Sequence, residues 1–187
     1  MIASLENAKV KYLMKLNTVK YRKKEKKFIV EGKHLVDEAR KCGILEEAFS
    51  IEWKDGYTQV SVSVMNKICN TDTVVPEIGL CRMLNNETIT NHILVLDAVQ
   101  DPGNMGALMR SAVAFGYSTV VLGEGCVDIY NDKVIRASQG AIFKLNFIYR
   151  NLLEFIPTLN EYQVYGTNVR NGISLDLSII HISEPTR

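Results

Sequence analysis

The chain has 187 residues, of which 47% are hydrophobic and 23% charged, with 22 Lys+Arg against 21 Asp+Glu. These proportions are typical of a globular protein and exclude a disordered chain, a collagen or a coiled-coil rod. The longest strongly apolar stretch, residues 93–99, is interrupted by Asp97 and is far shorter than the roughly 20 residues of a membrane helix. No basic region followed by an apolar one opens the sequence, which therefore predicts no secretory signal and no membrane association.

Cysteine usage predicts neither a metal site nor a disulfide framework. The four cysteines are far apart and contain no C-x-x-C pair: Cys42, Cys69, Cys81 and Cys126. The three histidines do not cluster with them in the sequence. We interpret the cysteines as reduced thiols in the core of a cytoplasmic protein.

Positive charge is concentrated near the N-terminal end. Residues 1–40 contain 11 Lys+Arg and 5 Asp+Glu, whereas the remaining residues contain 11 and 16. Six of the basic residues fall within eight positions: Lys20, Arg22, Lys23, Lys24, Lys26 and Lys27. Such a run is either a solvated loop or a surface that binds an anionic partner. Tyr21 inside the run favours nucleic acid, because an aromatic ring can stack on a base.

Short elements separated by polar residues and glycines are predicted in the first part of the chain. Ser4 is expected to cap a first helix, and the basic run follows as a loop. A second helix is predicted to open at Gly32 and to end before Gly43, the usual position of a C-terminal glycine. The other predicted elements are strands at 28–30, 44–51, 58–64 and 79–84 and a short helix at 65–69. The polar residues 85–88 are predicted to be a linker, which closes a first domain at 1–88.

Strands and helices are predicted to alternate in the second part. Residues 93–97 form a continuous apolar run closed by an acidic residue, which is typical of a buried parallel strand. The elements predicted after it are helices at 105–115, 132–139 and 152–159 and extended segments at 119–122, 144–149 and 163–166. This order predicts an α/β fold with a parallel sheet. Ligands of such sheets bind beyond the carboxyl ends of the strands, where residues 97–104 and 167–168 are expected.

The stretch from residue 96 to residue 116 carries the strongest chemical signal. Pro102 and Gly103 are predicted to form a tight turn whose shape Asn104 holds. Gly106 would let the start of a helix approach a strand or a ligand closely, and Arg110 lies one turn further on the same helix face. A guanidinium there suits a phosphate or a polarised hydroxyl. Neither the dinucleotide G-x-G-x-x-G pattern nor a P-loop lysine is present, and on chemistry alone a structural turn with a surface arginine fits equally well.

Two motifs resemble a known family, the SpoU (TrmH-type) RNA 2′-O-ribose methyltransferases of the SPOUT class. The first runs from Asp97 through Arg110 to Gly116 and opens with Asp-Ala-Val-Gln-Asp-Pro-Gly-Asn-Met-Gly; the second covers residues 133–143. The first helix, the basic run and residues 28–32 resemble the family's small RNA-binding domain, which is related to ribosomal protein L30e. The resemblance covers residues 4–176. It implies a small L30e-like α/β domain followed by a parallel-sheet methyltransferase domain of the trefoil-knot type at 89–176.

The resemblance implies methyl transfer from S-adenosylmethionine to a ribose 2′-hydroxyl, with ribosomal RNA as the expected partner. It places catalytic roles on Asn104 and Arg110. Since a free guanidinium stays protonated, we favour a role for Arg110 in orienting the hydroxyl and stabilising its developing negative charge. Thr167 matches a position near the methyl donor. The expected RNA contacts are Lys20, Arg22, Lys23, Lys24, Lys26, Lys27 and Arg136, although a structural ion pair fits Arg136 as well.

The C-terminal part departs from the family pattern. Family members continue beyond the strand at 163–167 with segments that form the trefoil knot, most of the donor pocket and much of the homodimer interface. This sequence lacks those segments, so we expect no knot, little donor binding and no turnover by the chain as written, with a homodimer only in full-length relatives. Residues 177–187 nearly match the translation of a sequencing adapter and are predicted to be an artefactual tail. The alternative function is that of a non-catalytic RNA-binding protein with a degenerate methyltransferase domain.

Overall fold

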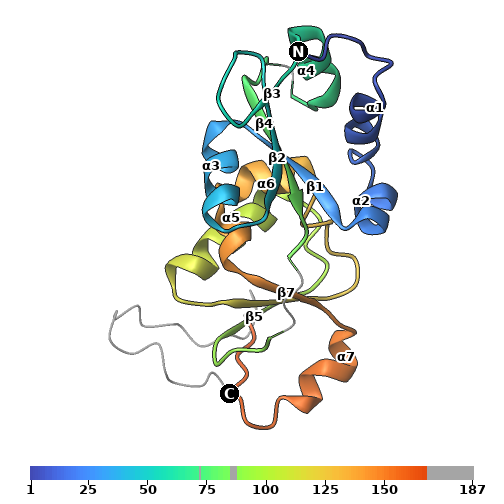
Figure 1. Cartoon of the computed structure of the whole chain (residues 1–187). Helices are drawn as coiled ribbons and strands as arrows, with labels where there is room; N and C mark the ends of the chain where they lie inside the picture. The colour runs from blue at the N-terminus through green and yellow to red at the C-terminus, as the bar shows by residue number, and fades with distance from the viewer. Residues whose placement is uncertain (72, 85–87, 168–187) are drawn as a thin grey trace. The chain divides into compact units, whose positions relative to one another are not determined.

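The computed structural model describes residues 1–71, 73–84 and 88–167 (Figure 1). The chain divides into two compact units, Met1–Tyr149 and Arg150–Arg187. The first unit contains two sheets, one of four strands in the order β1-β4-β2-β3 and one of three strands in the order β5-β6-β7. The sequence predictions of a mixed α/β fold and of a parallel sheet in the second part are therefore confirmed.

The four-stranded sheet is built from the N-terminal residues. Strand β4 pairs antiparallel with both β1 and β2, and β2 pairs parallel with β3. The elements of this part are α1 (Ala8–Lys15), α2 (Val19–Glu25), β1 (Lys27–Glu31), α3 (Lys33–Lys41), β2 (Leu45–Ser50), β3 (Thr58–Gln59), α4 (Val62–Ile68) and β4 (Glu77–Arg82).

Helix α3 forms where the glycine signals predict it. Gly32 is the N-cap with φ of +93°, and Gly43 follows the helix with φ of +67°. Residues other than glycine rarely adopt such angles, so both ends are determined locally. Between them Leu35, Val36 and Ala39 are buried at helical spacing in the core.

Three local predictions in this part are wrong. Asn7, not Ser4, caps α1, because its Oδ1 accepts a hydrogen bond from the amide of Lys9 at 2.9 Å. The basic run forms helix α2 instead of a loop. The predicted strand at 58–64 ends after Gln59, since the hydroxyl of Ser61 accepts from the amide of Val64 and starts α4.

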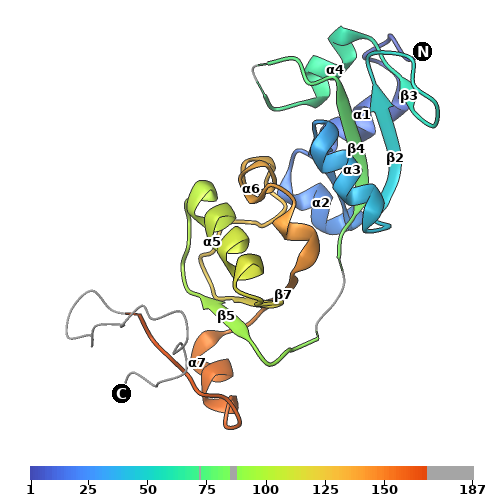
Figure 2. The ribbon, with the colours of Figure 1, turned by 90° about the vertical axis from the view of Figure 1, so that its left-hand side faces the viewer.

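The three-stranded sheet is parallel throughout, and Figure 2 shows α5 and α6 side by side next to it. Its elements are β5 (Ile93–Leu96), α5 (Pro102–Ala114), β6 (Thr119–Leu122), α6 (Asp132–Ser138), the 3-10 helix η1 (Ala141–Lys144) and β7 (Asn146–Tyr149). All four residues of the central strand β6 are buried. Strand β5 was expected to be buried as well, but three of its four residues are only half-buried because it lies at the edge of the described sheet.

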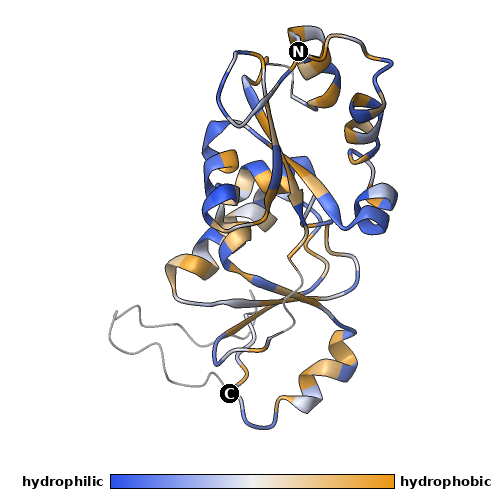
Figure 3. Ribbon diagram, in the orientation of Figure 1, coloured by the Kyte–Doolittle hydropathy of each residue, from blue (hydrophilic) through white to orange (hydrophobic). Residues whose placement is uncertain are grey.

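One apolar core joins the two sheets of the first unit. It contains Phe28 and Val36 from the N-terminal part together with Met105, Val120 and Val134 from the second part. The rings of Phe28 and Tyr130 lie 4.7 Å apart between centroids. Figure 3 shows apolar residues along the strands and mostly hydrophilic ones on α2. The N-terminal part thus shares its core with α5, β6 and α6.

The second unit, described by itself to residue 167, contains α7 (Leu152–Phe155) and the 3-10 helix η2 (Ile156–Thr158). The predicted helix at 152–159 is confirmed, whereas residues 163–166 belong to no strand. The predicted tail at 177–187 and Asn168 lie outside the described residues. Among the described residues, no helix is long and apolar enough to cross a bilayer.

All four cysteines are free thiols. Cys69 and Cys81 are buried, as predicted, and burial raises the pKa of Cys69 to about 12. Cys42 is exposed and Cys126 half-buried, so the prediction of a core position is wrong for Cys42.

Candidate active site

Two loops meet at the carboxyl edge of the parallel sheet. The carbonyl of Leu96, the last residue of β5, accepts hydrogen bonds from the amide of Gly123 at 2.8 Å and from the thiol of Cys126 at 3.4 Å. The amide of Val127 donates to the carbonyl of Val99 at 2.9 Å. The loops after β5 and β6 are therefore tied to one another at the edge where ligands of parallel sheets bind.

Helix α5 begins three residues before its predicted start. Asp101 is the N-cap, and its carboxylate accepts from the amide of Asn104 at 2.7 Å. Pro102 occupies the first helical turn, where its missing N–H costs nothing and its fixed φ suits the helix. Pro102 and Gly103 thus start the helix and do not form a separate turn. Asp101 holds this segment through the Asn104 backbone, and the Asn104 side chain is exposed, without a hydrogen bond to the described residues.

The close approach predicted for Gly106 is to a second helix. A methyl group at Gly106 would lie 2.6 Å from the carbonyl carbon of Ala137 and 2.8 Å from the amide nitrogen of Ser138. Both of these atoms belong to helix α6. Gly106 therefore lets α5 and α6 pack backbone to backbone, and not against a strand or a ligand as the sequence suggested.

Substituting Gly106 with alanine is expected to lower the free energy of unfolding by about 1–3 kcal/mol, the usual effect of overpacking. The added methyl group meets backbone atoms of α6, which cannot rotate away as a side chain can. Urea unfolding measures the effect. Ser111→Ala, at an exposed position of the same helix, is the control and should change stability by less than about 0.5 kcal/mol. Equal stability of Gly106→Ala and wild type would contradict the close packing.

Arg110 reaches the same point of α6. Its Nη1 donates a hydrogen bond to the carbonyl of Ala137, the residue that Gly106 abuts. The predicted common face of Gly106 and Arg110 is thus confirmed. The side chain is otherwise exposed, and a guanidinium carries five N–H donors. The bond to Ala137 holds the group in one direction, and among the described residues the guanidinium makes no other hydrogen bond.

The basic run contains four exposed lysines, one of which, Lys24, lies 4.0 Å from a carboxylate oxygen of Glu25. Lys20, Lys23, Lys24 and Lys26 are exposed on or directly after α2. Lys27 instead forms an ion pair with Glu46, and that hydrogen bond raises the pKa of the lysine.

Arg22 was predicted to contact RNA, and its position contradicts this. It is only 5% exposed, and its Nη2 donates to Asp128 Oδ2 at 2.6 Å while Nη1 donates to the carbonyl of Leu16 at 3.0 Å. Helical spacing turns this one basic residue inward, away from the neighbouring lysines. No sequence signal singled out Asp128 as its partner.

Arg136 forms structural ion pairs, which the sequence left open as the alternative to an RNA contact. Its guanidinium bonds to Glu31 Oε2 at 3.3 Å and to Asp132 Oδ2 at 2.8 Å. Glu31 also accepts from the amide of Asn70 at 3.1 Å. These contacts link β1 to α6 and leave Arg136 engaged with protein carboxylates.

The described residues fit a methyl donor only in part. The backbone groups of the loops after β5 and β6 are bonded to one another, and Gly125, at φ of +81°, packs against Ala98. Thr167, the donor contact that the resemblance implies, is the last described residue and belongs to the second unit. Among the described residues no group of His, Cys, Asp and Glu could hold a metal ion.

Comparison with known proteins identifies two matching family models. The model of the SpoU rRNA Methylase family matches residues 91–186, and that of the MRM3-like substrate binding domain matches residues 7–76. The 23S rRNA (guanosine(2553)-2′-O)-methyltransferase RlmP of Bacillus subtilis is 36% identical over 184 residues, which are 91% of this chain and 74% of that protein. The mitochondrial rRNA methyltransferase 3 of Mus musculus is 29% identical over 73% of this chain, which spans only 38% of that longer protein.

Solved structures share the fold. A crystal structure of an RNA 2′-O ribose methyltransferase aligns with a TM-score of 0.75 and 28% identity, covering 93% of this chain and 75% of that one. The AdoMet-bound rRNA methyltransferase from Sinorhizobium meliloti aligns with a TM-score of 0.79 and 25% identity, covering 90% of this chain and 72% of that one.

Proposed function

Because the chain belongs to the SpoU rRNA methylase family, we propose that it methylates a ribose 2′-hydroxyl of ribosomal RNA and that Arg110 is the central residue of its site. The observation that carries the proposal is the exposed guanidinium of Arg110, which donates a hydrogen bond to the Ala137 carbonyl of α6. S-adenosylmethionine supplies the methyl group when bound. Thr167 is the one donor contact we propose.

Arg110 is suited to donate hydrogen bonds to the ribose 2′-oxygen that is methylated. The N–H groups that do not bond to Ala137 can donate to the 2′-oxygen, orient it and stabilise the negative charge that develops as the proton leaves for solvent. A group that remains protonated serves as donor and not as base. Asn104, exposed in the first turn of the same helix, is proposed as a second contact to the substrate.

We propose residues 1–88 as an L30e-like RNA-binding domain; the match of residues 7–76 to a substrate binding domain supports this. The proposed contacts to RNA phosphate are the exposed lysines on or directly after α2, which are Lys20, Lys23, Lys24 and Lys26. Lys27 and Arg136 are already paired with carboxylates, and Arg22 is buried, so we leave these three out of the surface. A homodimer and a cytoplasmic site of action follow from the resemblance and belong to the same proposal.

Replacing the four exposed lysines of α2 with glutamine should weaken RNA binding and reduce its dependence on salt. Each lost phosphate contact lowers the slope of log K against log[salt] by about 0.7–0.9, so a total of up to about 3.6 is expected for four contacts. Fluorescence anisotropy of labelled RNA at several salt concentrations measures the slope. A double variant of exposed lysines elsewhere, Lys67→Gln and Lys133→Gln, should leave the slope unchanged. Equal slopes in the two variants would exclude α2 as the phosphate-binding element.

Methyl incorporation from labelled S-adenosylmethionine into unmodified ribosomal RNA tests the function. The 187-residue chain is compared with a version extended by the C-terminal segment of the Bacillus subtilis relative. Incorporation at a ribose 2′-oxygen by either version supports the proposal. Salt-sensitive RNA binding without incorporation by both would instead favour the non-catalytic RNA-binding protein.

A further inference from the structure

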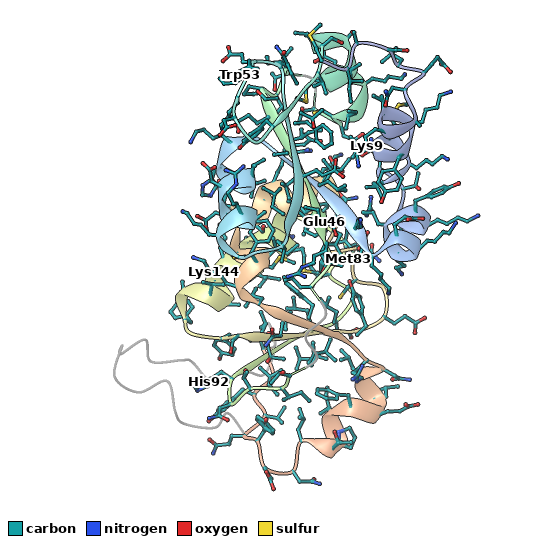
Figure 4. The ribbon with its side chains drawn as sticks, in the orientation of Figure 1. Lys9, Glu46, Trp53, Met83, His92 and Lys144 are labelled. Atoms are coloured by element: carbon teal, nitrogen blue, oxygen red, sulfur yellow. The ribbon has the colours of Figure 1, made fainter. Side chains whose placement is uncertain are left out.

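The chain's one tryptophan is among the most exposed large apolar residues that the structure describes. Trp53 lies between β2 and β3 and is 79% exposed, and Figure 4 shows its side chain on the loop that joins these strands. Tryptophan is highly buried on average, because its large ring gains much from leaving water. A nearly fully exposed indole therefore calls for a partner that covers it.

The loop that carries Trp53 has a defined shape. The amide of Tyr57 donates to the carbonyl of Lys54 at 3.1 Å, and Gly56 between them adopts a φ of +73°. Lys54 Nζ bonds to both carboxylate oxygens of the buried Glu77, at 2.9 and 3.0 Å, and to the hydroxyl of Tyr57 at 3.1 Å. Because the turn is already ordered, little conformational entropy is lost when a ligand contacts the indole.

Flat and cationic groups lie beside this turn. The ring of Tyr57 has Lys54 Nζ at 4.2 Å and the guanidinium carbon of Arg40 at 5.1 Å from its centroid. The hydrogen bonds to Glu77 and Tyr57 raise the pKa of Lys54, which keeps its ammonium charged. Arg40 is exposed, so a planar guanidinium on an aromatic ring is presented to solvent near the Trp53 loop.

Charge and size indicate what the indole contacts. Glu52 and Asp55 flank Trp53 and Lys54, so this loop is not a strongly positive, phosphate-binding patch like α2. A single large aromatic side chain among charged residues is also too small for a stable protein interface. Unpaired RNA bases, in contrast, stack on aromatic side chains and guanidinium planes, and the stacking needs no net positive charge.

We propose that Trp53 stacks on an unpaired base of the RNA substrate, which makes the β2–β3 loop a second RNA contact separate from α2. The inference rests on the proposed function, and it adds that the substrate has a single-stranded or bulged nucleotide at this point. The matched substrate binding domain, residues 7–76, includes the loop.

The sole tryptophan makes the test direct, because all indole fluorescence of the chain comes from this position. The wild-type chain is titrated with a mixed-sequence single-stranded RNA oligonucleotide and, separately, with the same strand annealed to its complement. Quenching by the single strand and little quenching by the duplex are expected. Anisotropy of the labelled single strand then gives the affinities of the variants.

Trp53→Ala should weaken single-strand binding by about tenfold, whereas Trp53→Phe, which keeps an aromatic face, should retain most of the affinity. Val62→Ala, at an exposed apolar position of the same domain, is the matched control and should bind like wild type. Circular dichroism confirms that each variant is folded. The α2 lysine variant should still show quenching once enough RNA is added to saturate it.

Binding without quenching, together with wild-type affinity of Trp53→Ala, would overturn the inference and leave the proposed RNA-binding function intact. No RNA binding by the wild-type chain would contradict both. A fluorescence change that follows protein concentration in the absence of RNA would assign Trp53 to a contact between copies of the chain, and would also overturn the inference.

Discussion

Arg110→Ala is expected to lower methyl incorporation by about 10²–10³-fold, the usual loss when one donor to a developing oxyanion is removed. The free energy of unfolding should change little, because Arg110 is exposed and its one hydrogen bond to the described residues is with the Ala137 carbonyl. Incorporation of labelled methyl groups into unmodified ribosomal RNA measures the loss in whichever version of the protein, given or extended, is active.

Two further variants separate chemistry from structure at this position. Arg110→Lys keeps the charge but loses the planar fork of donors, so an activity between those of wild type and Arg110→Ala is expected. Ser111→Ala, the next residue and also exposed, should methylate like wild type. Full activity of Arg110→Ala would remove Arg110 from the mechanism and leave it as a structural link between α5 and α6.

Arg22→Ala is expected to be the most destabilising substitution in the basic run, at about 3–5 kcal/mol, because it leaves a largely buried carboxylate without its partner. The side chain of Asp128 is only 17% exposed, and the carbonyl of Leu16 loses a donor at the same time. Chemical denaturation of the purified chain measures the change. Lys23→Ala, the next residue of α2 and exposed, is the control and should stay within about 0.5 kcal/mol of wild type.

The double variant Arg22→Met, Asp128→Leu tests the cause. Replacing a buried ion pair by apolar residues of similar volume is often nearly neutral, so much of the stability lost in Arg22→Ala should return. RNA binding by the double variant is expected to keep its salt slope, since Arg22 does not face solvent. A lowered slope would restore Arg22 to the RNA-binding surface and contradict its assignment as a buried anchor.

Features that depend on neighbouring residues could be predicted before the structure was known. Gly32 and Gly43 mark the two ends of α3. Both positions have a positive φ, which only glycine adopts readily. The alternation of apolar strands and helices predicted the parallel sheet β5-β6-β7. The motif from Asp97 to Gly116 was long enough to indicate the family, which the comparisons confirmed. Asn104 and Thr167 stay predicted site residues.

Prediction from the local sequence pattern was wrong where two kinds of secondary structure fit the same residues. The valines at 60, 62 and 64 alternate as in a strand, yet the Ser61 hydroxyl caps α4, and Val64, Met65 and Ile68 then bury at helical spacing. Asp101 likewise draws Pro102 into the first turn of α5, where the sequence suggested a separate turn. In both places one capping hydrogen bond decided the outcome.

Which basic residues are held in ion pairs depends on contacts between segments far apart in the sequence. Arg22 is paired with Asp128, 106 positions away in the sequence, and Arg136 with Glu31, 105 positions away. A count of charges cannot separate these arginines from the exposed lysines beside them, because the ion pairs exist only once the chain has folded. The close contact of Gly106 and Arg110 with Ala137 likewise exists only in the folded chain, because it needs α5 and α6 packed together.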